Sequence, residues 1–278
     1  MEEYIEFCTS EYKRIYATEY DKSELKKHHD KRKFAQKRAI KETSVNAMRK
    51  FSNVEPSDIW KSIYISHINN FSGITDLDLI QNIISASQSW KKSSGHAFEE
   101  MIRDIGNIYL QDHGLKILLQ KELSVELKNQ NVKNEVRDIS WLREQIGTSI
   151  FDLFLAIEEE DGYFIYGCVQ SKTSIRDRVT RDREPSINAM RAFFISFAIC
   201  LDGDFLRLPK FQNMVNGNSK EFELNGWHYM YVFSNENVDM DRIKTIDISM
   251  DAFVQDSLKG AEFWQTQRQW LNPKWKSK

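Results

Sequence analysis

The most informative stretch of this chain is FDLFLAIEEEDGYFIYGCVQSK, residues 151–172. Two apolar runs on either side of an acidic, glycine-containing turn predict a β-hairpin, with strands at Phe151–Ile157 and Tyr163–Lys172. Each strand carries one group that is charged at neutral pH: Asp152 is the second residue of the first strand, and Lys172 ends the second. A carboxylate in an apolar hairpin is costly unless it is paired or holds a cation. The hairpin therefore predicts a site for a metal ion and a phosphate.

The geometry of this hairpin can be worked out from the alternation of side chains. If Ile157 pairs with Tyr163 across the turn, Asp152 lies opposite Cys168, and Lys172 points to the same face further along. A β-bulge, which is common beside active sites, would bring the lysine closer to the acid. We therefore expect Asp152 and Lys172 on one face of the sheet.

The composition is that of a globular protein with one large domain, or a core with a smaller attached part. The chain has 278 residues, of which 41% are hydrophobic and 29% charged, and a net charge of −2, so total charge does not indicate a nucleic-acid partner. Cys8, Cys168 and Cys200 form no CxxC pair, which argues against a disulfide scaffold or zinc knuckle. No apolar run reaches the roughly 18 residues of a membrane span, so we expect a cytoplasmic protein.

The pattern of elements predicts a helical N-terminal domain at residues 1–90 and an α/β core with C-terminal helices at residues 91–278. Ser93-Ser94-Gly95 indicates a break before a helix from His96 to about Leu110. The remaining expectations are strands at Lys116–Leu119, Leu123–Leu127, Met230–Phe233 and Ile243–Ile248, a helix at Ile187–Leu201, and a helical tail holding Trp264, Trp270 and Trp275.

Residues 31–50 contain a basic cluster in which a single acid, Glu42, faces eight cationic side chains. These are Lys31, Arg32, Lys33, Lys37, Arg38, Lys41, Arg49 and Lys50. The cluster is compatible with phosphate contacts and equally with a solvated helix face, since basic runs are commonly plain surface. Both interpretations stay open.

Phosphodiester hydrolysis explains why an acid and a lysine would be brought together. Mg²⁺ prefers carboxylate oxygens, and a lysine beside the attacking water can orient it or stabilise developing charge. A second acid is normally required, but the residue two before Lys172 is the uncharged Gln170. Asp182 and Glu184, at the start of the next predicted helix, are candidates for it.

Glu99 or Glu100 on the His96 helix could add a further acid, and Glu99 is favoured because it follows the apolar residue Phe98. Each of these acids also has a simpler interpretation. Asp152 could pair with an arginine, Glu99 could be surface, and Glu184 could favour a helix N-terminus.

An arginine-rich segment follows Lys172. Arg176-Asp177-Arg178 is suited to reading adjacent G·C pairs, because arginine matches guanine O6 and N7 and aspartate can accept from cytosine N4. The alternative is a salt-bridge ladder on a helix. Weaker candidates for DNA contact are Arg181, Arg183, Lys91 and Lys92.

Four stretches carry a family resemblance: SWKKSSGHAFEEM (89–101), the FD…QSK hairpin, KTSIRDRVTRDREPS (172–186) and NGWHYMYVF (225–233). Together they resemble the type II restriction endonucleases of the PD-(D/E)XK group that recognise CCGG-centred sites, in particular the BsaWI family and, more remotely, AgeI-like enzymes. The resemblance covers nearly the whole chain. Two departures are that Phe151 replaces the proline of the motif, and that the basic N-terminal cluster has no counterpart we can place.

The resemblance implies a restriction-endonuclease-like α/β core, a mixed central sheet flanked by helices, with a helical N-terminal part. It implies Mg²⁺-dependent cutting of both strands of double-stranded DNA by a homodimer, or a higher oligomer, at a palindromic CCGG-containing site such as WCCGGW. Asp152 and Lys172 match the metal-binding acid and the lysine of the motif, and Glu99 matches the acid on the first core helix. The second acid is often displaced to the following helix in this group, which leaves Asp182 and Glu184 open. Arg176, Asp177 and Arg178 match the base-reading element.

Two other function classes remain to be weighed. A repair or structure-directed nuclease of the same fold would cut according to DNA shape, and a non-catalytic DNA-binding protein would not cut. An ATP-driven enzyme is not expected, because the sequence lacks a GxxxxGK[ST] loop, and neither is an HExxH zinc hydrolase.

Overall fold

The computed structural model describes residues 3–172, 179–201, 208–217, 219–234 and 239–277. The chain divides into two compact units, Met1–Lys91 and Lys92–Lys278. The sequence placed this boundary at residues 90 and 91. In the described part of the chain, none of the helices has the length and apolar character that crossing a bilayer requires.

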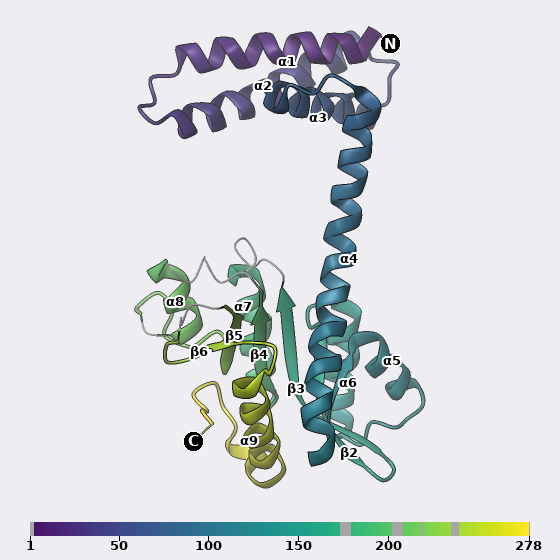
Figure 1. The fold of residues 1–278 in the computed structure, drawn as a ribbon, viewed down its shortest axis with the longest axis vertical. Coiled ribbons are helices and arrows are strands. Elements are labelled where there is room, and N and C mark those ends of the chain that lie inside the picture. The colour runs from purple at the N-terminus through teal and green to yellow at the C-terminus, as the bar shows by residue number, and fades with distance from the viewer. Residues whose placement is uncertain (1–2, 173–178, 202–207, 218, 235–238, 278) are drawn as a thin grey trace. The chain divides into compact units, whose positions relative to one another are not determined.

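The first unit is helical, as expected from its spacing of apolar residues. Its helices are α1 (Glu3–Lys22), α2 (His28–Lys50), α3 (Pro56–Ser72) and the beginning of α4 (Leu77–Leu110), as Figure 1 shows. The first three pack around a buried cluster that includes Tyr12, Ala39 and Ile59. Proline is tolerated at the first position of α3, where no backbone donor is needed.

Part of the basic cluster of α2 is paired within this unit. Arg38 lies 3.3 Å from Glu19 and 3.6 Å from Glu42, and Lys50 lies 3.4 Å from Glu3. Lys33 and Lys37 are exposed. Both interpretations of the cluster therefore remain predictions.

Helix α4 corrects the expected break at Ser93-Ser94-Gly95, because it runs without interruption from Leu77 to Leu110. One glycine inside a helix costs only about 1 kcal/mol, and no proline interrupts this helix. The buried side chains of Phe98 and Ile102 fix its second half against the core. Tertiary packing thus overrides a weak local signal.

The second unit contains one six-stranded sheet in the order β1-β2-β3-β4-β5-β6. Strands β1 to β3 are antiparallel, and β3 to β6 are parallel. After the end of α4 the elements are η1 (Gln111–His113), β1 (Leu115–Leu119), α5 (Gln120–Lys128), α6 (Val136–Thr148), β2 (Leu153–Glu159), β3 (Gly162–Lys172), α7 (Val179–Arg191), β4 (Ile195–Cys200), α8 (Pro209–Asn216), β5 (Tyr229–Phe233), β6 (Ile243–Ile246), α9 (Asp251–Gln267) and η3 (Arg268–Trp270).

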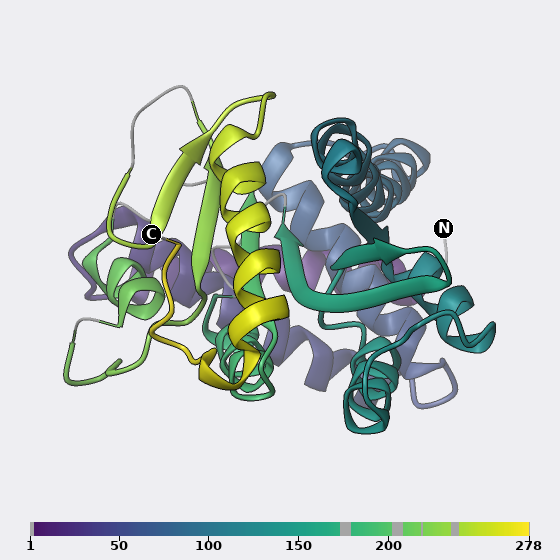
Figure 2. The same cartoon turned by 90° about the horizontal axis from the view of Figure 1, so that it is seen from below.

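Helices cover both faces of this sheet, which confirms the expected mixed sheet flanked by helices. Residues of α4 and α9 pack with one set of strand side chains, as shown by the cluster of Ile102, Leu155, Phe197 and Phe253. Helices α5, α6 and α7 pack on the other face, and α8 covers its far part. Figure 2 shows α9 lying along the parallel strands.

Two further secondary-structure predictions were wrong. Residues 123–127 belong to helix α5, because Leu123 and Leu127 are buried four residues apart and the Glu122 carboxylate accepts a hydrogen bond from the Leu119 N–H at 2.8 Å. The helix expected at Ile187–Leu201 is instead the end of α7 followed by β4. Phe193 has a positive φ of 64°, which ends the helix, and the mostly apolar segment Ile195–Cys200 then forms a fully buried central strand.

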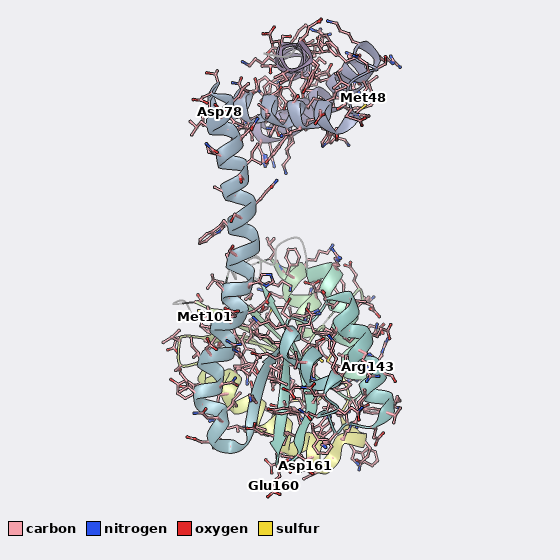
Figure 3. The ribbon with its side chains drawn as sticks, turned by 90° about the vertical axis from the view of Figure 1, so that its right-hand side faces the viewer. Met48, Asp78, Met101, Arg143, Glu160 and Asp161 are labelled. Atoms are coloured by element: carbon pink, nitrogen blue, oxygen red, sulfur yellow. The ribbon has the colours of Figure 1, made fainter. Side chains whose placement is uncertain are left out.

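The hairpin register also differs from the expected one. Ile157 pairs with Phe164, not Tyr163, and a bulge shifts the pairing between Leu155 and Ala156. The turn is consequently shorter, with Glu160 and Asp161 at its tip (Figure 3). The bulge is the irregularity that the sequence allowed but could not locate.

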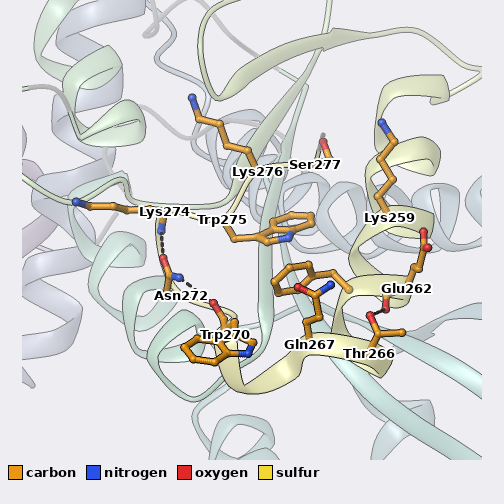
Figure 4. Close-up of a pocket in the computed structure, with 11 residues that line it drawn as sticks. Lys259, Glu262, Thr266, Gln267, Trp270, Asn272, Lys274, Trp275, Lys276 and Ser277 are labelled. Carbon is orange, nitrogen blue, oxygen red and sulfur yellow. Dashed lines mark hydrogen bonds between the residues drawn. The ribbon is translucent and has the colours of Figure 1, made fainter.

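The C-terminal segment is only partly helical. Helix α9 ends at Gln267, and Trp275 lies beyond η3 in an irregular segment, where its backbone carbonyl accepts a hydrogen bond from buried Arg242 at 2.9 Å. A hollow of about 570 Å³ lies between α9 and this segment (Figure 4). Its lining includes Lys259, Phe263 and Trp270 and none of the residues that the sequence singled out for catalysis.

Candidate active site

Asp152 and Lys172 meet at one end of the β2–β3 hairpin. Asp152 immediately precedes β2 and Lys172 ends β3. The Lys172 Nζ lies 2.5 Å from the Asp152 Oδ2, and the Ser171 N–H donates to the same oxygen at 2.7 Å. The side chain of Lys172 is only 13% exposed and that of Asp152 only 16%. The acid and the lysine expected on one face are thus brought into direct, charge-assisted contact.

Glu99 of α4 is the third ionisable group at this place. Its side chain is 21% exposed and lies 3.3 Å from the His96 Nδ1. Burial raises the pKa of Glu99, the hydrogen bond from His96 lowers it, and the Asp152 carboxylate raises it again. The neighbouring Glu100 is instead directed to Lys121, at 3.1 Å. Glu99 is therefore the acid of α4 that shares an electrostatic environment with Asp152 and Lys172.

Gln170 occupies the motif position where an acid was missing, and it is almost fully buried, with 1% exposure. Its Nε2 donates to the backbone carbonyl of Asp182 at 3.1 Å. Its Oε1 accepts from the indole Nε1–H of Trp227 at 2.7 Å. Both ends of this amide are therefore occupied by the protein itself.

The two candidates for the displaced acid differ in their surroundings. Both belong to the first half of α7. Asp182 is half-buried, and its carbonyl is tied to Gln170. Glu184 is 64% exposed, and its carboxylate lies 3.8 Å from Arg191. Only Asp182 is linked to the strand that carries Lys172.

The predicted DNA contacts are only partly covered by the structure. Arg176, Asp177 and Arg178 lie outside the described residues, as do the side chains of Lys91 and Lys92. Arg181 is exposed on α7.

Arg183 was expected to contact DNA, but its guanidinium is turned inward. It donates to the carbonyls of Met214 and Leu224 and lies 5.1 Å above the ring of Phe222. Burial lowers the pKa of Arg183. The Arg183 guanidinium thus binds within the protein, whereas the sequence analysis expected it to be free to contact DNA.

The acids at this place fit a magnesium ion. Within the described ranges, no group of three or more His, Cys, Asp or Glu side chains is arranged around a common point. Mg²⁺ does not need such a cage, since it is commonly held by one or two carboxylates and keeps other positions for water and phosphate oxygens. Asp152, with Glu99 near it, supplies ligands of this kind.

Sequence reasoning missed Trp227. It appeared only within the stretch of residues 225–233 that carried the family resemblance, without a role. Its contact with Gln170 joins residues 57 positions apart. No local pattern could have indicated it, because periodicity reports only which face a residue occupies.

Glu99→Gln should stabilise the metal-free protein at neutral pH. A carboxyl whose pKa is higher in the folded than in the unfolded chain contributes stability at low pH, and this is lost as the pH rises through the folded pKa. We expect wild type and variant to melt together well below pH 4.3, the ordinary pKa of glutamate, and the variant to melt higher at pH 7. Thermal melts in EDTA measure this, and equal melting temperatures at pH 7 would contradict it.

A family model and solved structures match this chain. The family model for "BsaWI restriction endonuclease type 2" matches residues 126–266. The chain shares 51% sequence identity with restriction endonuclease BsaWI in the crystal structure of its pre-specific complex with DNA. The match covers 99% of both chains, with a TM-score of 0.84. Restriction endonuclease AgeI, in the crystal structure of its specific complex with DNA, shares 18% sequence identity with this chain. That match covers 89% of this chain and 90% of the AgeI chain, with a TM-score of 0.45. No curated protein sequence matches.

Proposed function

Since this chain belongs to the BsaWI family of type II restriction endonucleases and is thus a site-specific deoxyribonuclease, we propose that it cuts both DNA strands at a palindromic CCGG-containing site, including WCCGGW, with Mg²⁺ as cofactor. The observation that carries the metal-dependent chemistry is the pairing of Asp152 with Lys172, with Glu99 beside them. Asp152, Lys172 and Glu99 are half-buried ionisable groups from two different elements, and such a concentration of charge is typical of a functional site. A scissile phosphate and its cation would be the ligands of this site.

Each residue of the site has a distinct task in this proposal. Asp152 and Asp182 would hold the metal ion, and Glu99 would add a further carboxylate. When bound, Mg²⁺ supplies charge neutralisation at the phosphate and lowers the pKa of a bound water. The Lys172 ammonium has three donors, of which Asp152 takes one. The other two can orient the attacking water and stabilise charge on the phosphate oxygens.

A digest of mapped DNA tests the proposed specificity. Purified protein with Mg²⁺ should produce discrete fragments, and sequencing of their ends should place every cut within a CCGG-containing site. A scrambled duplex of the same length is the control and should stay intact. Fragments of random length, or equal cutting of the scrambled duplex, would instead indicate a nuclease directed by DNA shape.

Between the two displaced acids we favour Asp182, because it is half-buried and tied to Gln170, whereas Glu184 is exposed beside Arg191. Asp182→Asn should lower the single-turnover cleavage rate by about 10²–10³-fold, the usual effect of removing one electrostatic stabiliser. Glu184→Gln is the matched control and should stay within a few-fold of wild type. The reverse order of effects would assign the metal to Glu184.

Base reading is assigned in this proposal to Arg176, Asp177 and Arg178, on the strength of their hydrogen-bonding patterns. The exposed Arg181 and the lysines Lys91 and Lys92 would add phosphate contacts, which position a protein on DNA without specifying sequence. Arg183 is left out, because its guanidinium binds backbone carbonyls.

A homodimer, or a higher oligomer, would match the two-fold symmetry of a palindromic site, since each subunit would then cut one strand. Sizing of the protein with and without the CCGG duplex tests this. The cytoplasmic location expected from the sequence, in a prokaryotic host as the family resemblance implies, stays a prediction.

A further inference from the structure

We propose that Gln170 and Trp227 form a positioning pair that holds the first half of α7, and with it Asp182, at the metal site. This inference deepens the proposed function and rests on it. It explains why an amide stands where the motif would have an acid. The two residues act through hydrogen bonds to the protein and touch neither DNA nor metal.

The orientation of the Gln170 amide is fixed by chemistry. An indole N–H can only donate, so the atom 2.7 Å from the Trp227 Nε1 must be the amide oxygen. The amide nitrogen then faces the Asp182 carbonyl at 3.1 Å and donates to it. A glutamate carboxylate at this position would have no proton for that carbonyl and would place two oxygens against each other. The amide is therefore the group that satisfies both neighbours.

The short segment Gln170–Lys172 positions both proposed metal ligands. Gln170 binds the backbone of Asp182, the N–H of Ser171 and the ammonium of Lys172 bind the carboxylate of Asp152, and all three belong to the last residues of β3. A shift of α7 along the sheet would consequently move one acid relative to the other.

Trp227 gives this arrangement rigidity. It is 1% exposed and packs in the cluster formed by Ala198, Met214 and Met230. Its backbone carbonyl accepts from the Asn225 side chain at 2.7 Å. Arg183, which follows Asp182 in α7, binds the carbonyls of Met214 and Leu224. Helix α7 is therefore anchored to this region at two consecutive residues, Asp182 and Arg183.

The test compares two tryptophan variants. Trp227→Phe keeps an aromatic ring and removes the N–H that fixes Gln170. Trp264→Phe is the matched control, because Trp264 is also nearly buried and donates one hydrogen bond, to the Phe193 carbonyl at 3.0 Å. The measurements are the melting temperature in EDTA, the rise in melting temperature with Ca²⁺ and a CCGG duplex, and the Mg²⁺ dependence of single-turnover cleavage.

Trp227→Phe should raise two concentrations by about 10–100-fold, as expected when a group that orients a metal ligand is lost. These are the Ca²⁺ concentration that gives half of the maximal rise in melting temperature and the Mg²⁺ concentration that gives half of the maximal cleavage rate. Trp264→Phe should lose comparable stability and keep both concentrations within about two-fold of wild type. Gln170→Met, which removes both hydrogen bonds, should reproduce the metal effect if Trp227→Phe folds poorly.

Equal metal dependence of the two tryptophan variants would overturn the positioning role. A wild-type protein that shows neither cleavage nor a response to divalent cations would instead overturn the proposed function. The two failures are therefore distinguishable.

Discussion

Lys172→Ala should lower the rate of DNA cleavage by about 10²–10³-fold or more, while affinity for a CCGG duplex in Ca²⁺ stays within a few-fold of wild type. The ammonium contacts Asp152 at 2.5 Å and is the cation of this site that can orient water or stabilise the phosphate. Single-turnover cleavage and equilibrium binding measure the two quantities separately.

Lys244→Ala is the control for this experiment. Lys244 also pairs with a buried carboxylate, that of Asp256 at 2.6 Å, but lies on β6. It should lose stability and retain cleavage, which separates the loss of an ion pair from the loss of a catalytic amine. If Lys172→Ala cut DNA as fast as wild type, the protein would have another catalytic centre, and the assigned site would be wrong.

Arg268→Met should destabilise the second unit by about 3–5 kcal/mol, the usual cost of leaving one partner of a buried ion pair. Asp138 of α6 is 2% exposed, and its Oδ2 lies 2.5 Å from the Arg268 Nη2. The variant leaves this carboxylate buried, with a long 3.5 Å contact from the Asn134 amide. For a unit of this size the melting temperature should fall by roughly 6–20 °C.

A double-mutant cycle shows whether the buried charge causes this loss. Asp138→Asn combined with Arg268→Met removes both charges and should recover part of the stability. A double variant that is no more stable than Arg268→Met alone would attribute the effect to lost packing of Arg268 against Trp264, whose ring lies 4.8 Å away. Thermal and urea unfolding of the four proteins give the coupling energy.

Local patterns predicted the elements whose sequences carry one clear signal. The hairpin, the helices of the first unit and the strands β5 and β6 follow from alternation, apolar runs and helical spacing. The prediction failed at residues 187–201, where a largely apolar segment suits a buried helix and a buried strand equally well. The choice between them was made by the neighbours of β4, since it pairs with both β3 and β5.

In the candidate site, too, some features follow from local patterns and others depend on tertiary pairing. Asp152 and Lys172 could be found from the sequence because each is an ionisable group in an apolar strand, and alternation placed them on one face. Their separation could not be found, because the register depends on the bulge between Leu155 and Ala156. The proposed preference for Asp182 over Glu184 rests on burial, since Asp182 is half-buried in α7 and Glu184 is exposed.

The sequence alone identified the residues suited to metal-dependent phosphodiester hydrolysis: Asp152 and Lys172 on a hairpin, Glu99 on a helix, and Gln170 in place of the acid of the motif. The folded chain was needed to show that Gln170 is hydrogen-bonded to both Trp227 and α7, and that the Arg183 guanidinium binds backbone carbonyls. The two kinds of information differ in the distance along the chain over which they act. Patterns of alternation and helical spacing arise between near neighbours in the chain, whereas hydrogen bonds in a folded core join residues that only the packing of the sheet and its helices brings together.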